Sequence, residues 1–278
     1  MKVAVCLSRS QHQQTWGQAM IDGLKAHGMT VKECEYQESG DCEFAVIWGW
    51  KNAKHVKAPR ILLMERGHVG DRMHWTSVGW DGLARRGSYA HVEDGGDRWR
   101  SRWGHLLCPW KENEHGYVLL LGQVPGDWNL AYLREGFEPW AIRQARELCA
   151  MGYTVVYRPH PVVVERGGTF CPPNALLSKR ETLQENLKDA MVVVTYNSTA
   201  GVEAVLSGIP TVTQDIGAMA WPVTSHGLRE ALVRPRRHSW AHRLAWTQFS
   251  MAEIASGMCV EHLLSVMPEV PEVEAVHA

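Results

Sequence analysis

Two short polar segments, each directly after an apolar run, carry the side chains best suited to chemistry in this sequence. Arg158 and His160 follow the run "YTVVY" within the segment "RPHP", and Ser198 and Thr199 follow the run "MVVVTYN". Guanidinium and imidazole N–H groups donate strongly to oxyanions, and the two hydroxyls add further donors. Together the two segments fit a phosphate or diphosphate better than either does alone.

The Ser-Thr segment also has the pattern of a helix start. Ser198 and Thr199 stand where an N-cap belongs, Glu203 falls in the first turns, and Gly208 with Pro210 ends the helix. A helix N-terminus attracts anions, above all phosphate. An ordinary capped crossover between two strands, and a turn histidine held between two prolines, remain the alternative interpretations.

Composition limits the classes of protein that this chain can belong to. The 278 residues are 45% hydrophobic and 21% charged, which is enough for one large core or two ordinary domains. A net charge of −1 gives no global electrostatic reason to bind nucleic acid or a membrane surface. Seven cysteines without a C-x-x-C pair predict free thiols in a reducing cytoplasm. No apolar run approaches the roughly 18 residues of a membrane span.

Alternating strand and helix patterns predict the elements that position these side chains. In the first half, the segments "KVAVCL", "TVKECEY", "FAVIWGW" and "RILLMERG" are strand-like, and "GQAMIDGLKAHG" is helical. In the second half, strand-like "YVLLLGQ", "YTVVYRPHP", "VVVTYN" and "PTVTQ" alternate with helical segments. This alternation predicts an α/β fold with two Rossmann-like domains facing across a cleft, with ligands at the carboxyl ends of the strands.

We predict four segments along the chain. Residues 1–114 form the first domain, which carries an insert at 68–114 that is rich in Gly, Trp, Arg and His and has no clear period. Residues 115–235 form the second domain, and residues 236–267 form a helical segment. The tail at 268–278 has the composition of a disordered terminus.

Four segments resemble a known family of enzymes. In order, "LLLGQVPGD", "RPHP", "NSTAGVEAVLSGIPTV" and "GAMAWPVT" resemble the capsule-polysaccharide-type glycosyltransferases, which include bacterial Kdo transferases and relatives of GT-B sialyltransferases. The resemblance covers about residues 117–228, under half of the chain. It implies a GT-B-like fold and a nucleotide-sugar donor, either UDP- or CMP-linked. It also implies that His160 contacts the donor phosphate with Ser198 and Thr199 beside it, and that Glu203 lies near the ribose or the sugar.

Arg158 and Gln123 complete the predicted donor-binding set. Arg158 stands two residues before His160, and Gln123 ends the apolar run "YVLLLGQ". No D-x-D motif stands at a suitable place, so we expect transfer without a metal ion.

The acceptor is predicted from other parts of the chain. The segments "ERGHVGDRMHWTSVGWDGL" and "WAHRLAWTQFSMAEIASG" resemble phage-encoded proteins of glycosyltransferase type, which implies a hydroxymethylated base in DNA as acceptor. The stretch "LREALVRPRRHSWAHR" carries five arginines against one glutamate. A basic stretch can follow DNA phosphates, and aromatic rings can stack on an unpaired base. The residues expected to do so are Arg234, Arg236, Arg237, Arg243, Trp75 and Trp80.

The same residues allow two other interpretations of the acceptor side. The tryptophans can form the core of the insert while the arginines lie on a solvated face. Sugar rings also stack on aromatic side chains, which fits a capsule-type or other oligosaccharide acceptor. A sugar-nucleotide epimerase and a non-catalytic nucleotide-binding module also remain as alternatives.

Transfer with inversion needs a general base for the acceptor hydroxyl. The candidates in the first half are Asp71, Asp81 and Glu65. Asp81 lies in the Gly-flanked turn "GWDG", and Asp71 precedes Arg72, with which it could form an ion pair instead. Asp71 is our first choice because it lies in a Gly-rich loop after a strand.

Overall fold

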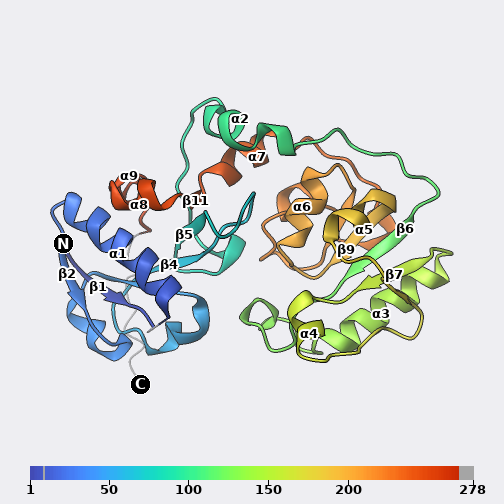
Figure 1. The fold of residues 1–278 in the computed structure, drawn as a ribbon, viewed down its shortest axis with the longest axis horizontal. Helices are drawn as coiled ribbons and strands as arrows, with labels where there is room; N and C mark the ends of the chain where they lie inside the picture. The colour runs from blue at the N-terminus through green and yellow to red at the C-terminus, as the bar shows by residue number, and fades with distance from the viewer. Residues whose placement is uncertain (9, 269–278) are drawn as a thin grey trace, which may run out of the picture. The chain divides into compact units, whose positions relative to one another are not determined.

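The computed structural model describes residues 1–8 and 10–268 (Figure 1). The chain divides into two compact units. Unit 1 consists of residues 1–95 together with the residues from 243 onward, and unit 2 consists of residues 96–242. Each unit is built around its own β-sheet.

The sheet of unit 1 has six strands, four of them parallel. The parallel strands are β1 (Lys2–Cys6), β2 (Thr30–Glu33), β3 (Phe44–Trp48) and β4 (Ile61–Arg66). Strand β5 (Thr76–Trp80) pairs antiparallel with β4, and β11 (Gln248–Phe249) pairs antiparallel with β5, which extends the sheet to the order β11-β5-β4-β3-β1-β2. The antiparallel edge was not expected from the sequence.

Both faces of this sheet are covered. Helices α1 (Gln11–Ala26), α8 (Met251–Ala255) and α9 (Met258–Leu264) cover one face, where Met20, Leu24 and Phe44 belong to one core cluster (Figure 1). The 3-10 segments Tyr36–Asp41 and Trp50–His55 cover the other face, above Ala45 and Ile47. The continuous apolar runs of β1 and β3 follow from burial on both faces.

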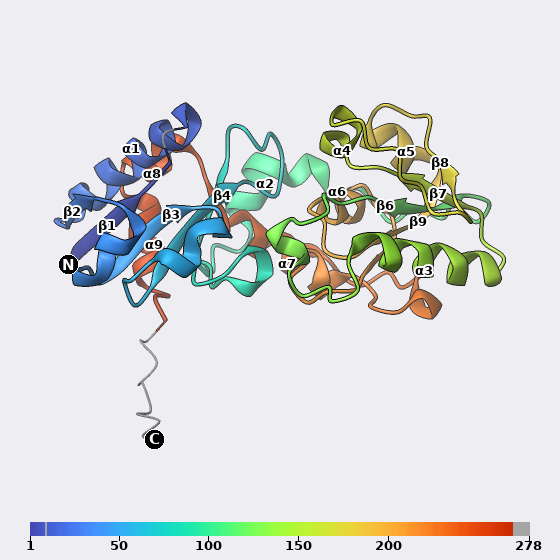
Figure 2. The same ribbon diagram turned by 90° about the horizontal axis from the view of Figure 1, so that it is seen from below.

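The sheet of unit 2 is parallel throughout, with the order β10-β9-β6-β7-β8. Its strands are β6 (Tyr117–Leu121), β7 (Val155–Arg158), β8 (Leu176–Leu177), β9 (Ala190–Thr195) and β10 (Thr211–Thr213). Helix α3 (Phe137–Ala150) shares a core cluster with Val118 and Leu120. Helices α5 (Leu183–Asp189) and α6 (Ala200–Leu206) share another with Leu119 and Leu121, and Figure 2 shows α3 and α5 on opposite faces.

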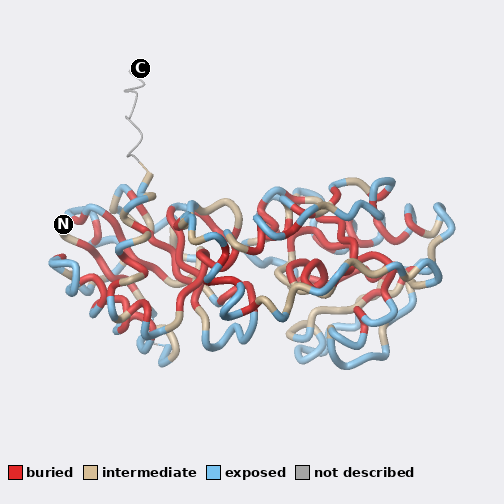
Figure 3. The backbone as a smooth tube through the Cα atoms, turned by 90° about the horizontal axis from the view of Figure 1, so that it is seen from above, coloured by how far each residue is buried: buried red, intermediate tan, exposed pale blue. Residues whose placement is uncertain are grey.

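Short elements complete unit 2. They are α2 (Asp97–Trp103), α4 (Pro161–Glu165), the start of α7 (His238–Ala245), and the 3-10 segments Gly104–Leu106, Trp128–Leu130, Trp221–Val223 and Leu228–Glu230. Figure 3 shows buried segments in the interior of each unit and exposed segments around its outside. No helix among the described residues is both long and apolar enough to cross a membrane.

The predicted α/β class with two Rossmann-like units is confirmed, and the cleft between them stays a prediction. The division at 95/96 lies before the predicted boundary at 114/115, because the intervening chain is bonded to unit 2. Cys108 N–H donates to the Leu206 carbonyl at 2.8 Å, and Lys111 N–H donates to the Gly208 carbonyl at 2.7 Å. The predicted helical segment 236–267 crosses the second division. Apart from residue 268, the predicted disordered tail 268–278 lies outside the described residues.

The predicted insert 68–114 is not one structural piece. Its first part contains β5, which pairs with β4 inside the sheet of unit 1, and its later part contains α2 in unit 2. Trp80, expected to stack on a base, is a core residue with 1% exposure. Its ring lies edge-on to Phe44 at 5.0 Å, and its Nε1–H donates to the Leu263 carbonyl at 2.8 Å. The expectation that Trp80 contacts an acceptor is therefore wrong.

We expect Trp80→Ala to lower the free energy of unfolding of unit 1 by about 3–5 kcal/mol, because it leaves a large cavity and an unpaired carbonyl. Trp80→Phe keeps most of the packing and loses the hydrogen bond, so we expect a smaller loss of about 1–2 kcal/mol. Urea unfolding followed by circular dichroism measures both. Equal stability of wild type and Trp80→Ala would contradict the core assignment.

Candidate functional site

The predicted donor residues gather at the carboxyl edge of the unit 2 sheet. Arg158 is the last residue of β7 and is half-buried. One guanidinium nitrogen, Nη2, donates to the Glu181 carbonyl at 3.0 Å, while Nε is buried and has no hydrogen-bond partner among the described residues. Burial lowers the pKa of Arg158, and the negative charge of Glu203 on α6 opposes that shift. Arg158 and Glu203, 45 positions apart in sequence, thus act on one another electrostatically.

His160 is the N-cap of α4, and this role fixes its tautomer. The imidazole Nδ1 accepts a hydrogen bond from the Val162 N–H at 3.2 Å, and Pro161 occupies the first helical position. Since Nδ1 acts as an acceptor, the proton of the neutral ring is on Nε2. The neutral ring of His160 therefore offers Nε2–H as a donor, as contact with a phosphate oxygen requires.

Gly122 lets the ends of β6 and β7 approach closely. Its N–H donates to the Arg158 carbonyl at 2.7 Å. A Cβ at this position would lie 2.8 Å from the His160 backbone nitrogen and 2.8 Å from the Tyr157 hydroxyl. Only glycine fits there without displacing the turn that carries His160.

Gln123 lies in a buried amide network beneath the Ser-Thr turn. Its Nε2 donates to Asn197 Oδ1 at 2.8 Å, and its Oε1 accepts from the Asn197 N–H at 3.1 Å. Asn197 Nδ2 in turn donates to the Asn129 carbonyl at 2.6 Å and to Asp215 Oδ2 at 2.7 Å. Gln123 is therefore placed to position the site, a role the sequence did not predict. The sequence did not predict Asn197 or Asp215 as site residues. The segment "YNST" could have indicated Asn197, which directly precedes the two hydroxyl residues.

Ser198 and Thr199 are half-buried beside this network. The Ser198 N–H donates to Thr195 Oγ1 at 3.1 Å, and the Ala200 N–H donates to Ser198 Oγ at 3.2 Å. These bonds already occupy N–H groups that an anion at the helix end would need. Because Ser198 Oγ acts as acceptor, its hydroxyl proton serves as donor, so the hydroxyl is the better ligand-binding group here.

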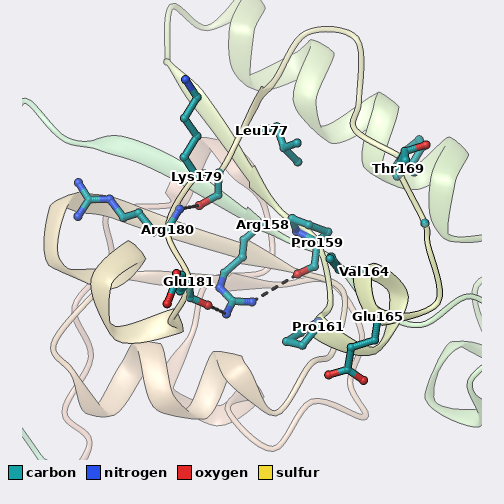
Figure 4. A pocket seen from close by; sticks show the side chains of 13 residues that line it. Arg158, Pro159, Pro161, Val164, Glu165, Thr169, Leu177, Lys179, Arg180 and Glu181 are labelled. Carbon is teal, nitrogen blue, oxygen red and sulfur yellow. Dashed lines mark hydrogen bonds between the residues drawn. The ribbon is translucent and has the colours of Figure 1, made fainter.

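A pocket of about 510 Å³ adjoins Arg158 at the ends of β7 and β8 (Figure 4). Its apolar wall includes Val164, Phe170 and Leu177, and its polar wall includes Lys179 and Glu181. Figure 4 shows Arg158 bonded to the carbonyls of Glu181 and Pro159. A mostly apolar pocket of this volume with a few polar groups is typical of small-molecule sites.

The three candidate general bases lie in unit 1 and differ in their surroundings. Asp71 is exposed, and its carboxylate accepts from the Met73 N–H at 2.9 Å and contacts His74 Nδ1 at 2.8 Å. The Met73 N–H, followed by His74, lowers the pKa of Asp71. This shift makes Asp71 a weaker base than an ordinary aspartate, and its catalytic role stays a prediction.

Asp81 has a structural role. Its Oδ1 accepts from the Ile61 N–H at 2.8 Å, and its Oδ2 lies 3.0 Å from Nε of the buried Arg60, in ion-pair contact. Asp81 also has a φ of 53°, which aspartate tolerates better than most residues. Both carboxylate oxygens hold the turn, so Asp81 is a poor candidate. Glu65 is half-buried on β4 opposite Ser77, and its role stays a prediction.

His12 is a further basic group at the carboxyl edge of the unit 1 sheet. The sequence-based candidates for the general base were all carboxylates and did not include it. It follows β1, and its ring lies edge-on to Trp48 at 4.9 Å. Burial, followed by the charge of Arg66, lowers the pKa of His12, which favours the neutral ring. Its Nε2 is buried and has no hydrogen-bond partner among the described residues.

The four predicted DNA-binding arginines are not equivalent. Arg234, Arg236 and Arg243 are exposed, whereas Arg237 is 6% exposed. Arg237 Nη2 donates to the Cys108 carbonyl at 2.6 Å, Nη1 donates to the Val205 carbonyl, and the guanidinium stacks 3.7 Å above the Trp110 ring. The expectation that Arg237 contacts DNA phosphates is wrong, because its donors are used inside the protein. Trp75 is half-buried, and its role stays a prediction.

No group of three or more His, Cys, Asp or Glu side chains within residues 1–8 and 10–268 is arranged to hold a metal ion. Metal-independent transfer stays a prediction.

The two Rossmann-like units give the chain a fold of the GT-B glycosyltransferase type. Two similar solved structures are from Thermosulfurimonas dismutans KpsC. Its β-Kdo 2,4 transferase structure has a TM-score of 0.59 and 16% identity, over 89% of this chain and 91% of that chain. Its β-Kdo 2,7 transferase structure has a TM-score of 0.54 and 12% identity, over 94% and 99%. At these identities the likeness shows the fold alone.

No protein-family model matches the sequence, and no curated protein matches it either.

We expect Gly122→Ala to disturb the site, because the added methyl group would force the backbone of His160 and the Tyr157 hydroxyl outward. Nucleotide affinity should fall about tenfold or more, with a small loss of thermal stability. Gly227→Ala is the matched control, since a Cβ at that position meets nothing within 4 Å. Calorimetric titration with nucleotides measures the effect, and equal affinities of the two variants would contradict this assignment.

Proposed function

We propose that this protein is a glycosyltransferase that uses a nucleotide-sugar donor held by unit 2. The observation that carries the proposal is that Arg158, His160 and Ser198 all follow strands at the carboxyl edge of one parallel sheet, where Arg158 also lines a pocket of about 510 Å³. Ligands of open α/β sheets bind at this edge. The GT-B-like fold adds support.

The donor would lie along the edge of the sheet. Its base would enter the pocket between β7 and β8, against Phe170 and Leu177. Its phosphate would accept from His160 Nε2–H and from the hydroxyls of Ser198 and Thr199. Glu203 would lie near the ribose or the sugar. The donor is a UDP- or CMP-sugar under this proposal.

The reaction joins the acceptor oxygen to the anomeric carbon as the bond from that carbon to the phosphate oxygen breaks. Negative charge grows on the leaving phosphate, and donors fixed in advance lower the barrier most effectively. His160 and Arg158 are such donors, since an N-cap bond and two carbonyls hold them. The acceptor proton would pass to a base in unit 1, where Glu65, Asp71 and His12 remain candidates.

A saccharide hydroxyl is the better-supported acceptor. The similar KpsC structures are Kdo transferases, and the buried Trp80 and Arg237 cannot contact DNA. A hydroxymethylated base in phage DNA is the second candidate, because Arg234, Arg236 and Arg243 remain exposed.

His160 offers a sharp test of the donor site. His160→Ala removes both the helix cap and the Nε2–H donor, whereas His160→Asn retains a capping side chain and removes only the donor. We expect both variants to bind CMP or UDP about 10- to 100-fold more weakly, as for the loss of a hydrogen bond to a charged group. Ser198→Ala combined with Thr199→Ala should have a similar effect.

Calorimetric titration with CMP, UMP, CDP and UDP measures these affinities. Full affinity in His160→Asn would show that the cap alone matters and would contradict the phosphate contact. Transfer is then measured by mass spectrometry, with oligosaccharides and hydroxymethylated DNA supplied as separate acceptors.

Arg236 and Arg243, which are exposed, separate the two acceptors, and the buried Arg237 is the contrast. Arg237→Ala should destabilise unit 2 by about 3–5 kcal/mol, because the removed group satisfies two carbonyls in the interior. Arg236→Ala with Arg243→Ala should leave stability unchanged. If DNA is the acceptor, this double variant should lower the slope of log affinity against log salt by about 0.9 for each phosphate contact. Gel retardation at several salt concentrations measures the slope, and an unchanged slope would count against DNA.

A further inference from the structure

One tryptophan of this chain is unlike the other twelve. Of the thirteen, all of which the structure describes, only Trp128 is exposed rather than buried or half-buried, at 41%. Tyr132, four residues later, is 64% exposed. Burying such rings is favourable, so a solvent-facing pair of them on one loop indicates a surface that binds something.

The segment that carries this pair is well ordered by its own contacts. Asp127 Oδ1 accepts from the Asn129 N–H at 2.9 Å and so caps the 3-10 turn Trp128–Leu130. Leu130 is buried in the core of unit 2, and the Leu133 N–H donates to its carbonyl at 2.9 Å. The inner side chains of the segment thus hold it in place while the two aromatic rings face solvent.

Asn197 ties this segment to the donor site. Its Nδ2 donates both to the Asn129 carbonyl, next to Trp128, and to Asp215 Oδ2. Ile216, beside Asp215, is 52% exposed. The buried amide of Asn197 therefore joins three loops, which follow β6, β9 and β10, and we call this meeting point the junction. The loop after β6 carries the exposed Trp128, and the loop after β10 carries the exposed Ile216.

The sheet order places this junction relative to the pocket. The pocket lies at the ends of β7 and β8, on one side of the central strand β6. The loops held by Asn197 follow β6, β9 and β10, toward the other side, and Ser198 is the next residue after Asn197. Because Asn197, next to Ser198, is bonded to the carbonyl of Asn129, next to Trp128, a donor phosphate held at Ser198 would lie close to the segment that carries Trp128.

We propose that Trp128, together with Tyr132, is a stacking platform for a sugar ring of the acceptor saccharide. This inference rests on the proposed glycosyl transfer and adds the acceptor subsite to it. The C–H faces of a pyranose pack on an aromatic ring while its hydroxyls stay solvated. An open platform suits an acceptor that extends beyond one ring, whereas the donor sugar needs a site that excludes water.

The charges of this loop favour a saccharide over a nucleic acid. Residues 122–136 contain one arginine, no lysine and two acidic residues, Asp127 and Glu135. A surface that stacks bases of a single strand normally combines its aromatics with a positively charged groove that follows the phosphates. This segment carries a net charge of −1 instead.

A glycan array that also carries hydroxymethylated oligonucleotides tests the proposal. The proteins compared are the wild type, Trp128→Ala, Trp128→Phe, Tyr132→Ala and the control Met151→Ala. Met151 is an exposed apolar residue just after α3, at the amino end of β7 and so at the opposite edge of the sheet. We expect the wild type to bind at least one class of glycan and Trp128→Ala to bind it about tenfold more weakly. Trp128→Phe should retain part of the binding, and Met151→Ala all of it.

Calorimetric titration of the same proteins with CMP and UDP separates this proposal from the donor site. Nucleotide affinity should be unchanged in every variant, because none of the substituted residues lines the pocket. Full glycan binding by Trp128→Ala, no glycan bound by the wild type, or binding to oligonucleotides alone would each overturn the platform. A wild type that binds glycans through Trp128 but binds no nucleotide would instead reject the donor site and keep the platform.

Discussion

The side-chain amide of Asn197 is the interaction on which the rest of the unit 2 site depends. A buried amide that lacks partners is costly, and this one is satisfied by Gln123, Asn129 and Asp215. Gln123 and Asn129 follow β6, Asp215 follows β10, and Asn197 itself follows β9, so the amide sets the relative positions of three loops at once. The Ser-Thr turn, the aromatic segment and the loop after β10 are therefore positioned by one polar group, and a change at Asn197 would affect all of them.

The carboxyl edge of the sheet could be read from the sequence because two local patterns coincide there. Apolar runs followed by Arg158–His160 and by Ser198–Thr199 place polar groups at the ends of buried strands, and parallel strands bring such ends together. Local pattern also predicted the strand-helix alternation of both units. Local sequence pattern could not distinguish a residue that contacts a ligand from one that supports the site. Gln123 is an example, because its side chain is bonded to Asn197, which lies 74 positions away in the sequence.

The acceptor side was harder to predict because exposure of tryptophan and arginine is a tertiary property. Trp80 and Trp128 stand in similarly polar, glycine-containing segments, yet the first is buried against Leu263 and the second faces solvent. Arg236 and Arg237 are neighbours, and only Arg237 finds interior carbonyls and the Trp110 ring. Strand β5 was missed for a related reason: "TSVGW" is short, and its partners β4 and β11 are what make it a strand.

The return of the C-terminal chain to unit 1 has a consequence for how the protein is made. Unit 2 is continuous in sequence and is complete once residue 242 has been synthesised. Unit 1 still lacks β11, α8 and α9 at that moment, so Trp80, Phe44 and Leu24 remain partly uncovered on the ribosome. Chains generally fold domain by domain from the N-terminus during synthesis. Here the order is reversed: the strands β1 to β5 of unit 1 are made before unit 2, yet their apolar face stays uncovered until residues 248–264 have been synthesised.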